Sequence, residues 1–538
     1  MGLHRGGTCA ASAPLFFLRL DNPKSRNVLN VLIVGSSTVS SRVAGLFRDM
    51  LMFGILGRSV YCSAFLYAFT LPNLFRRLLG EGALTSALIP VMARELDEKG
   101  KPGFYSLLNK VLSRVAVVLF VSVAVGCAGM WLARGYFPDG GKWDLLLKYG
   151  TFLFPFLVMI CLSAVIGGAL NSLGKFGAVA LTPLALNLCM IFSMAVLANF
   201  LGDNLDEKVQ WLCAGVLAGG LLQFAMPAWA LWKSGWKPVA DFQDSPEIQC
   251  AWKLFVPGVA GASVLQVNLL VSRTLSFSLE DSAVALLFLA SRLVELPLGI
   301  FTIAVTTVIF PQIAKLQVQK EHDRFHSTFQ KGLLWILVLT IPAAVGLGVL
   351  AGPILDFLFN WGLFDDSAVQ DTIPILQISA AGLPFYSAVA MYTRGFHAQQ
   401  DMHRPLRGSV HVLIANLALS LLLMKFYGVY GLAVAGVLSS VYQCVYLHHF
   451  FHPGKSSILN ADLAKVVISA ALMGLVCHAL WKFESQYLGT GKQASFLFIL
   501  NLIPVGIGSY LAFLWLSRFS EFDVIARKFL LKIFARRS

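Results

Sequence analysis

Hydrophobic residues form long, nearly unbroken runs along most of this chain, and short polar stretches separate the runs. A helix that crosses a bilayer needs about 20 consecutive apolar residues. The pattern predicts fourteen such helices, at 28–54, 58–93, 104–133, 144–172, 175–201, 208–234, 247–278, 282–314, 327–355, 367–398, 404–426, 429–451, 460–482 and 493–517. Prolines inside several runs, for example Pro72, Pro155 and Pro384, predict kinks.

The composition points to the same class of protein. Of 538 residues, 57% are hydrophobic and only 13% are charged, and the mean hydropathy is +0.72. A soluble domain carries about 25% charged residues. The nine cysteines form no CxxC pair and lie mostly in apolar runs, so we interpret them as small core residues. The sequence therefore predicts an all-α polytopic membrane protein.

The net charge of +14 has a clear sidedness. If the N-terminus and every second loop are cytoplasmic, most lysines and arginines outside the spans fall on that side, as the positive-inside rule requires. The opposite side collects acids instead: Asp203, Asp206, Glu207, Glu280, Asp281, Asp356, Asp365, Asp366 and Asp371. We therefore expect both termini in the cytoplasm, and the charge needs no nucleic acid as a partner.

The two ends of the chain are basic. Residues 1–27 have an apolar patch that Arg19 interrupts, which makes a poor signal peptide. They are interpreted as a cytoplasmic tail, or as the product of a start codon placed too early. Residues 520–538 include the basic amphipathic stretch RKFLLKIFARRS, which we expect on the inner leaflet.

Two pairs of segments indicate an internal repeat. LTSALIPVMAR at 84–94 resembles VTTVIFPQIAK at 305–315, so that Pro90 matches Pro311 at an offset of 221. Likewise 154–177 resembles 383–406, and both Pro155 with Pro384 and Asn187 with Asn416 match at an offset of 229. Because each half would hold six helices, both halves insert in the same orientation, as in parallel-repeat transporters.

The predicted organisation is two pseudo-symmetric six-helix lobes plus two C-terminal helices. Its boundaries are a tail at 1–27, an N-lobe at 28–234, a cytoplasmic linker at 235–246, a C-lobe at 247–452, helices 13 and 14 at 453–519, and a basic tail at 520–538.

Charged residues inside the apolar runs are the candidate chemistry, since a charge at bilayer depth costs at least about 2.5–3.5 kcal/mol. In the first helix, Arg42 and Asp49 share a stripe and Arg48 is turned away by about a third of a circle. If Arg42 and Arg48 border one cavity, they would suit an anion, because a guanidinium group donates two parallel hydrogen bonds to phosphate. Alternatively, Arg42 anchors the helix at the inner leaflet and Arg48 with Asp49 forms a helix-end pair.

Two further groups join this set. Arg76 and Arg77 follow Pro72, and Arg77 can pair with Glu81 at i,i+4; alternatively both arginines mark the cytoplasmic end of the second helix. Arg292 and Glu295 are an i,i+3 pair, which a purely structural role would also explain. For Arg273 and Arg394, we rank structural pairing above substrate contact.

Other candidate sites are weaker. His448, His449 and His452 have metal-ligand spacing, but a solvated basic helix end is favoured, and we predict no metal. The pair Asp365–Asp366 could be catalytic, but acidic outer-loop composition is favoured. No Walker A, GxSxG or HExxH motif is present, so we predict no catalytic residues.

Four motifs, SRVAGLFRD (41–49), LPNLFRRLLGEGALTSALIPV (71–91), SRLVELPLGIFTIAVTTVIFP (291–311) and GFHAQQDMHRP (395–405), resemble the MurJ (MviN) lipid II flippases, over roughly 28–450. That family belongs to the multidrug/oligosaccharidyl-lipid/polysaccharide exporter superfamily. The resemblance implies an inner-membrane transporter, not an enzyme, that carries the undecaprenyl-diphosphate-linked precursor of peptidoglycan to the outer leaflet by alternating access.

Carried over by motif, the resemblance implies substrate-binding roles for Arg42, Arg48, Arg76, Arg292 and Glu295. Asp49, Arg77 and Glu81 would be supporting charges. The chain departs from the family pattern at Ser63, Thr70 and Ser291, where charged residues are often found.

The resemblance also implies lipid II and the bilayer as partners, other peptidoglycan-synthesis proteins as possible ones, and a monomer. We expect no cofactor, and an ion gradient or the membrane potential could drive transport. Some family members bind sodium in the C-lobe. We do not expect sodium here, because the seventh helix carries Arg273, and an arginine disfavours a cation site. The alternatives are an exporter of another polyprenyl-linked polysaccharide or of drugs, a membrane glycosyltransferase using the same lipid, and a scaffold without transport.

Overall fold

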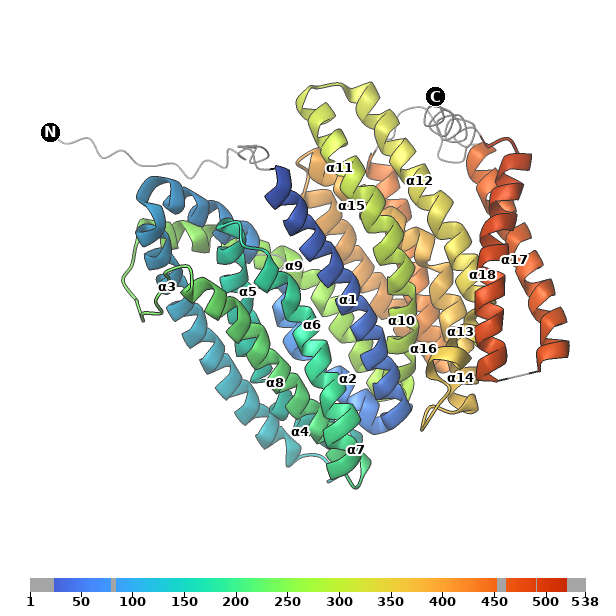
Figure 1. Ribbon diagram of the computed structural model, residues 1–538, viewed down its shortest axis with the longest axis horizontal. Coiled ribbons are helices and arrows are strands. Elements are labelled where there is room, and N and C mark those ends of the chain that lie inside the picture. Colours follow the sequence, from blue (N-terminus) through green and yellow to red (C-terminus); the bar gives the residue numbers. More distant parts are fainter. Residues whose placement is uncertain (1–23, 79–83, 452–460, 490, 520–538) are drawn as a thin grey trace. The chain divides into compact units, whose positions relative to one another are not determined.

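The structure is a computed structural model that describes residues 24–78, 84–451, 461–489 and 491–519 (Figure 1). Helices make up almost all of this described part. Nine of them are long and apolar enough to cross a membrane, and the bent pair Lys142–Leu153 and Phe156–Ser172 would make ten. The all-α, multi-pass architecture is confirmed, whereas the number fourteen stays a prediction. Residues 1–23 and 520–538, and residues 452–460 with His452, lie outside the described residues.

The chain divides into two compact units: Met1–Leu51 with Ala68–Gln266, and Met52–Tyr67 with Val267–Ser538. Helices α1 (Lys24–Leu56), α2 (Val60–Arg76) and α9 (Pro246–Leu279) each cross from one unit to the other. The predicted boundaries of the lobes, linker and tails stay predictions.

The first unit is built on packed helices α3, α5, α6 and α8, which lie side by side in Figure 1. Besides parts of α1, α2 and α9, this unit contains α3 (Leu84–Arg134), α4 (Lys142–Leu153), α5 (Phe156–Ser172), α6 (Gly177–Phe192), a π-helix at Ser193–Leu197, α7 (Ala198–Leu201) and α8 (Leu205–Trp232). Buried side chains of α3 and α5, such as Phe104 and Leu170, form much of its core.

In the second unit α12 packs on α11, α14, α15 and α17. Besides parts of α1, α2 and α9, the second unit contains α10 (Ala283–Pro297), a π-helix at Leu298–Thr302, α11 (Ile303–Val318), α12 (His322–Val349), α13 (Ala351–Phe359), α14 (Asp366–Ala381), α15 (Leu383–Ala398), α16 (His403–Phe451), α17 (Ala461–Leu488) and α18 (Lys492–Leu516). Val338, Met473 and Tyr510 join α12, α17 and α18 in one cluster. The two C-terminal helices therefore belong to this unit.

Glycines interrupt the two longest helices. Gly100 in α3 has φ 65° and Gly428 in α16 has φ 55°, a backbone conformation that glycine adopts without steric cost. The chain turns back on itself within α16, so that Arg404 near its start donates to the carbonyl oxygen of Phe450 at its end, at 3.1 Å. The predicted separation of 404–426 from 429–451 therefore coincides with this turn.

The predicted repeat has a structural counterpart at its prolines. In the first unit α4 ends at Leu153 and α5 begins at Phe156, with a 43° bend between them. In the second unit α14 ends at Ala381 and α15 begins at Leu383. These boundaries fall beside Pro155 and Pro384, the residues that match at an offset of 229, but only the first is sharply bent, since Asp366–Ala398 forms one candidate span.

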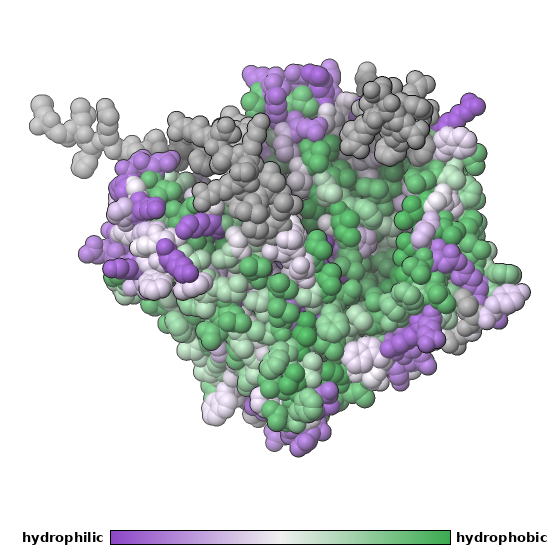
Figure 2. Space-filling model, in the orientation of Figure 1, coloured by the Kyte–Doolittle hydropathy of each residue, from purple (hydrophilic) through white to green (hydrophobic). Residues whose placement is uncertain are grey.

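Figure 2 shows hydrophobic residues over the middle of the helices and hydrophilic residues at their ends. On α3, for example, Val118, Phe120, Val125 and Trp131 are exposed although they are apolar. Exposed apolar surface along helices of this length is the surface that a bilayer solvates.

The segment that joins α8 to α9 is held along α3 of the first unit. Tyr105 donates to the carbonyl oxygen of Ser234 at 2.7 Å, and Trp236 donates to Asn109 at 2.8 Å. Further along, Arg114 binds the carbonyl oxygen of Phe242 at 2.7 Å. The predicted linker 235–246 is thus not a free tether.

The end of α1 packs tightly within the second unit. Leu363 N–H donates to the carbonyl oxygen of Gly54 at 2.8 Å, and a Cβ on Gly54 would lie 2.3 Å from the Trp361 ring. Arg58 forms an ion pair with Asp371 beside this contact. Gly54 and Arg58 therefore fasten the end of α1 and the residues after it to α14 and to the loop before α14.

Candidate functional site

Arg48 and Asp49 form a buried ion pair in the first unit. Only 7% of Arg48 and 3% of Asp49 is exposed. The Nη2 and Nε atoms of Arg48 lie 2.6 and 3.0 Å from Oδ1 of Asp49. Arg48 precedes the end of α1 at Leu56 by about 12 Å along the helix axis, at 1.5 Å per residue. The pair therefore lies inside the predicted span 28–54.

Asn187 of α6 completes this cluster. Its Oδ1 accepts a hydrogen bond from Nη1 of Arg48 at 2.9 Å, and its Nδ2 donates to the carbonyl oxygen of Ser41 at 3.0 Å. Asn187 itself is buried. One amide side chain thus connects α6 to both the backbone and the arginine of α1.

The cluster keeps a guanidinium charged in an apolar setting. A buried ion pair is stable only when its geometry is good and its remaining donors are satisfied. Three Arg48 nitrogens have partners here, and Asp49 neutralises the charge. Arg48 and Asp49 therefore pair with each other although the helical-wheel argument turned Arg48 away from the stripe of Arg42.

The other predicted charges of the first unit lie in different surroundings. Arg42 is exposed and lies about 1.7 turns before Arg48 in α1. Arg76 is the last residue of α2 and is half-buried, while Arg77 follows it and is exposed. Residues 77 and 78 continue the chain after α2 as π-helix, and residues 79–83 of the predicted span 58–93 lie outside the described residues. Glu81, and with it the expected pair with Arg77, lies outside the described residues.

In the second unit the expected pair of Arg292 and Glu295 is confirmed. Their side chains lie 2.9 Å apart in α10 and are 39% and 51% exposed. The guanidinium carbon of Arg292 lies 5.7 Å from the ring centroid of Phe288, within cation–π range. Arg273 of α9 approaches the same ring at 5.4 Å and donates to the carbonyl oxygen of Val284 at 3.2 Å. Two arginines thus converge on Phe288.

Asn416 of α16 is the repeat partner of Asn187, and it too contacts the first helix of its own half. Its Nδ2 donates to Oδ1 of Asn268 at 2.9 Å and to Oγ of Ser272 at 3.1 Å, both on α9. Ser439 donates to its Oδ1 at 3.4 Å. The residues that it contacts are neutral.

Weaker sequence candidates have structural partners. Asp365 caps α14, with the Ala368 N–H at 2.9 Å, and Asp366 accepts from Asn360 at 2.6 Å. Hydrogen bonds from Ser367 and Ala368 hold the pKa of Asp365 below its usual range. His448 contacts the hydroxyl of Tyr392 at 2.9 Å, and Arg394 lies over the Phe310 ring. Both carboxylates of the Asp365–Asp366 pair thus have hydrogen-bond partners, and the preference for ordinary acidic outer-loop composition stays a prediction.

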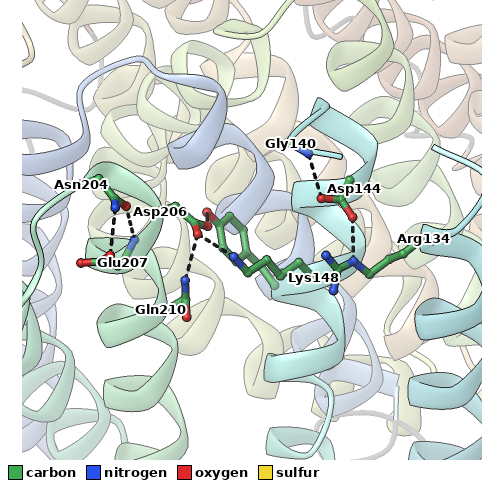
Figure 3. A network of polar contacts seen from close by, with 9 residues as sticks. Arg134, Gly140, Asp144, Lys148, Asn204, Asp206, Glu207 and Gln210 are labelled. Atoms are coloured by element: carbon green, nitrogen blue, oxygen red, sulfur yellow. Dashed lines mark hydrogen bonds and ion pairs between the residues drawn. The ribbon is translucent and has the colours of Figure 1, made fainter. Parts of the chain in front are cut away.

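A second charged network in the first unit was not predicted (Figure 3). Arg134 of α3 pairs with Asp144 of α4 at 2.6 Å, and Lys148 of α4 pairs with Asp206 of α8 at 2.5 Å. Asp206 also accepts from Tyr149 at 2.7 Å. These contacts join the ends of three helices, and their residues lie at predicted span ends, where sequence reasoning expects solvated charge.

Sequence reasoning also missed Asn187 as the partner of Arg48. Asn187 entered only as a marker of the repeat, because it matches Asn416. A polar amide in the apolar run ALNLCMIF was the available signal, since a buried amide needs hydrogen-bond partners. Its specific partner depends on the packing of α6 against α1, which no local pattern encodes.

Comparison with known families gives one strong match. The model of the family described as "Lipid II flippase MurJ" matches residues 52–501. A Vibrio cholerae protein described as "Probable lipid II flippase MurJ" is 31% identical over 505 residues, covering 90% of this chain and 95% of that protein. The "Lipid II flippase MurJ" of Burkholderia cenocepacia is 29% identical, covering 75% of this chain and 80% of that protein.

Solved structures agree with this match. A lipid II flippase MurJ in an inward closed conformation superposes with a TM-score of 0.75 at 26% identity, covering 90% of this chain and 98% of that one. An inward-facing MATE-family multidrug resistance transporter superposes at 0.64 with 14% identity, covering 77% and 94%. The second likeness concerns the fold alone.

Proposed function

The chain belongs to the MurJ family of lipid II flippases, and from this membership we propose that it moves lipid II from the cytoplasmic to the outer leaflet of the bacterial inner membrane. The family model covers most of the chain, from residue 52 to 501. The chain is a multi-pass transporter and not an enzyme. Both termini lie in the cytoplasm in this proposal, as the sidedness of the basic loops indicates.

The observation that carries the proposal is the arginine set at the family's motif positions. We propose that Arg42, Arg48 and Arg76 of the first unit and Arg292 of the second bind the lipid diphosphate, with Glu295 orienting Arg292. Asp49 and Arg77 are supporting charges, as is Glu81 in the same motif. A buried guanidinium such as Arg48 suits this task, because charge-assisted hydrogen bonds to phosphate strengthen where water is excluded.

Transport then follows the alternating-access scheme. The headgroup enters from the cytoplasmic side, the arginines take over its diphosphate, and the two halves rearrange to release it outward. The undecaprenyl tail stays in the bilayer, along helices α17 and α18. The chain works as a monomer, without a cofactor, driven by an ion gradient or by the membrane potential.

Two alternatives are less well supported. A drug or polysaccharide exporter would share the fold, as the MATE likeness illustrates, but a cation exporter favours acids over the arginines present here. A glycosyltransferase needs a free catalytic acid. Asp365 instead caps α14, and Asp366 accepts a hydrogen bond from Asn360.

Depletion of the protein tests the function. Cells that lose it are expected to accumulate lipid II that an outer-face enzyme or toxin cannot reach. Exposure of lipid II at the normal rate would contradict the proposal.

Alanine variants test the site. Arg42→Ala, Arg48→Ala, Arg76→Ala and Arg292→Ala are each expected to abolish complementation while the protein still inserts. Normal complementation by most of them would favour the anchoring and structural roles instead.

A further inference from the structure

We propose that Asn187 is a positioning residue for lipid II binding, which acts by holding the Arg48 guanidinium through a neutral oxygen. The inference rests on the proposed function and deepens it. Asn187 touches no motif arginine other than Arg48 among its hydrogen bonds in the described residues, and its contact spans 139 positions of sequence.

The first step of the argument is geometric. Asp49 binds Nε and Nη2 of Arg48 from one side, and Asn187 binds Nη1 from the other at 2.9 Å. Asn187 cannot turn its amide freely, because Nδ2 donates to the carbonyl oxygen of Ser41 at 3.0 Å. The donor to Ser41 therefore fixes which atom faces Arg48, and Asn187 Oδ1 fixes the plane of the guanidinium.

The second step concerns charge. Arg48 and Asp49 together are neutral, and an amide at 187 keeps them so. A carboxylate of the same shape would make the cluster anionic, and at short range in a poorly solvated site it would repel a diphosphate strongly. An amide thus holds the arginine without competing with the substrate as a second anion.

The third step is the exchange on binding. Replacing the neutral oxygen of Asn187 at Nη1 by a phosphate oxygen exchanges a neutral acceptor for an ionised one, which makes a stronger hydrogen bond. Replacing Asp49 would sacrifice a charged partner. The substrate oxygen therefore takes the place of Asn187 Oδ1, and Asp49 stays bound.

The repeat supplies a matched control. Asn416 is buried at the corresponding position, on α16, but its partners Asn268 and Ser272 carry no charge. Asn416→Asp makes the same chemical change in the other unit, beside neutral hydrogen-bond partners. Gly45→Ala is a second reference variant, because its added Cβ would lie 3.5 Å from Asn187 Nδ2, an ordinary van der Waals contact.

The test measures binding of fluorescently labelled lipid II to full-length variants in nanodiscs, together with their melting temperatures. Asn187→Asp is expected to weaken binding about tenfold or more, through charge repulsion. Asn187→Leu, which keeps the shape but removes both hydrogen bonds, is expected to weaken it less, and Asn416→Asp is expected to bind as the unchanged protein does.

The results separate the possibilities. Unchanged binding by Asn187→Asp overturns the inference, and so does an equal loss in Asn187→Asp and Asn416→Asp, which would indicate a structural role for both asparagines. If the unchanged protein fails to bind lipid II, the proposed function fails instead.

Discussion

The two asparagines that match in the repeat hold different partners. Asn187 in the first unit contacts Arg48, which is paired with Asp49, whereas Asn416 in the second unit contacts Asn268 and Ser272. In both units the asparagine joins the first and the fifth predicted spans of its half. These spans are 28–54 and 175–201 in the first half, and 247–278 and 404–426 in the second. The shared contact supports the internal repeat, and the different partners place a buried ion pair beside Asn187 but neutral side chains beside Asn416.

The arginines of the two units differ in the same sense. Arg48 is 7% exposed, and its partners fix three of its nitrogens. The side chain of Arg292 is 39% exposed and lies beside the Phe288 ring. One guanidinium is held by a closed network, and the other is accessible beside an aromatic ring. An anion would therefore have to displace a partner of Arg48 but could approach Arg292 directly.

The largest expected effect comes from removing the acid of each pair. Asp49→Asn leaves the Arg48 charge uncompensated in a buried site and is expected to lower stability by about 3–5 kcal/mol. Glu295→Gln breaks a pair that solvent reaches and is expected to cost at most about 1 kcal/mol. Thermal unfolding of the purified proteins measures both, and equal losses would remove the distinction between the units.

A smaller effect distinguishes the two ends of α1. Gly54→Ala places a Cβ 2.3 Å from Trp361 and is expected to cost about 1–3 kcal/mol, because the ring must shift. Gly45→Ala meets only Asn187 Nδ2, at 3.5 Å, and is expected to be tolerated. The same unfolding measurement checks the pair. A larger loss from Gly45→Ala would show that the packing around Asn187 is tighter than the contact with the loop.

The smallest effect is expected at Asp365. Asp365→Ala removes the cap of α14 and is expected to lower stability by about 1 kcal/mol, less than Asp49→Asn or Gly54→Ala, with transport unaffected. Because its pKa is lowered in the folded protein, the stabilisation is present at neutral pH and is lost as the pH falls below about 3.9. Unfolding of both proteins between pH 3 and 7 measures this. Loss of transport at neutral pH would contradict this prediction, because Asp365 would then do more than cap α14.

Much of the fold follows from local patterns. Long apolar runs predict helices, prolines predict their breaks, and Pro155 and Pro384 mark the breaks in register. The i,i+3 spacing of Arg292 and Glu295 also predicts their ion pair. These features depend on residues that are neighbours in sequence, so the sequence encodes them directly.

The remaining features depend on packing between distant segments. The Arg48–Asn187 contact requires α6 to lie against α1, and the approach of Arg273 to Phe288 requires α9 to lie against α10. The fastening of residues 234–242 along α3 likewise depends on Asn109 and Arg114, which look like ordinary polar positions in sequence. Pattern reasoning identified Arg48 and Arg273 as charged residues inside apolar runs but did not identify Asn187 or Phe288 as their contacts.

Photo-crosslinking tests the central claim most directly, with lipid II that carries a photoreactive group next to its diphosphate. We predict crosslinks to α1 and α6 around Arg48, and to α10 around Arg292. In Arg48→Ala, we predict that the crosslinks to α1 and α6 are lost. Crosslinks confined to α9 and α16 around Asn416, or unchanged by Arg48→Ala, would contradict the account.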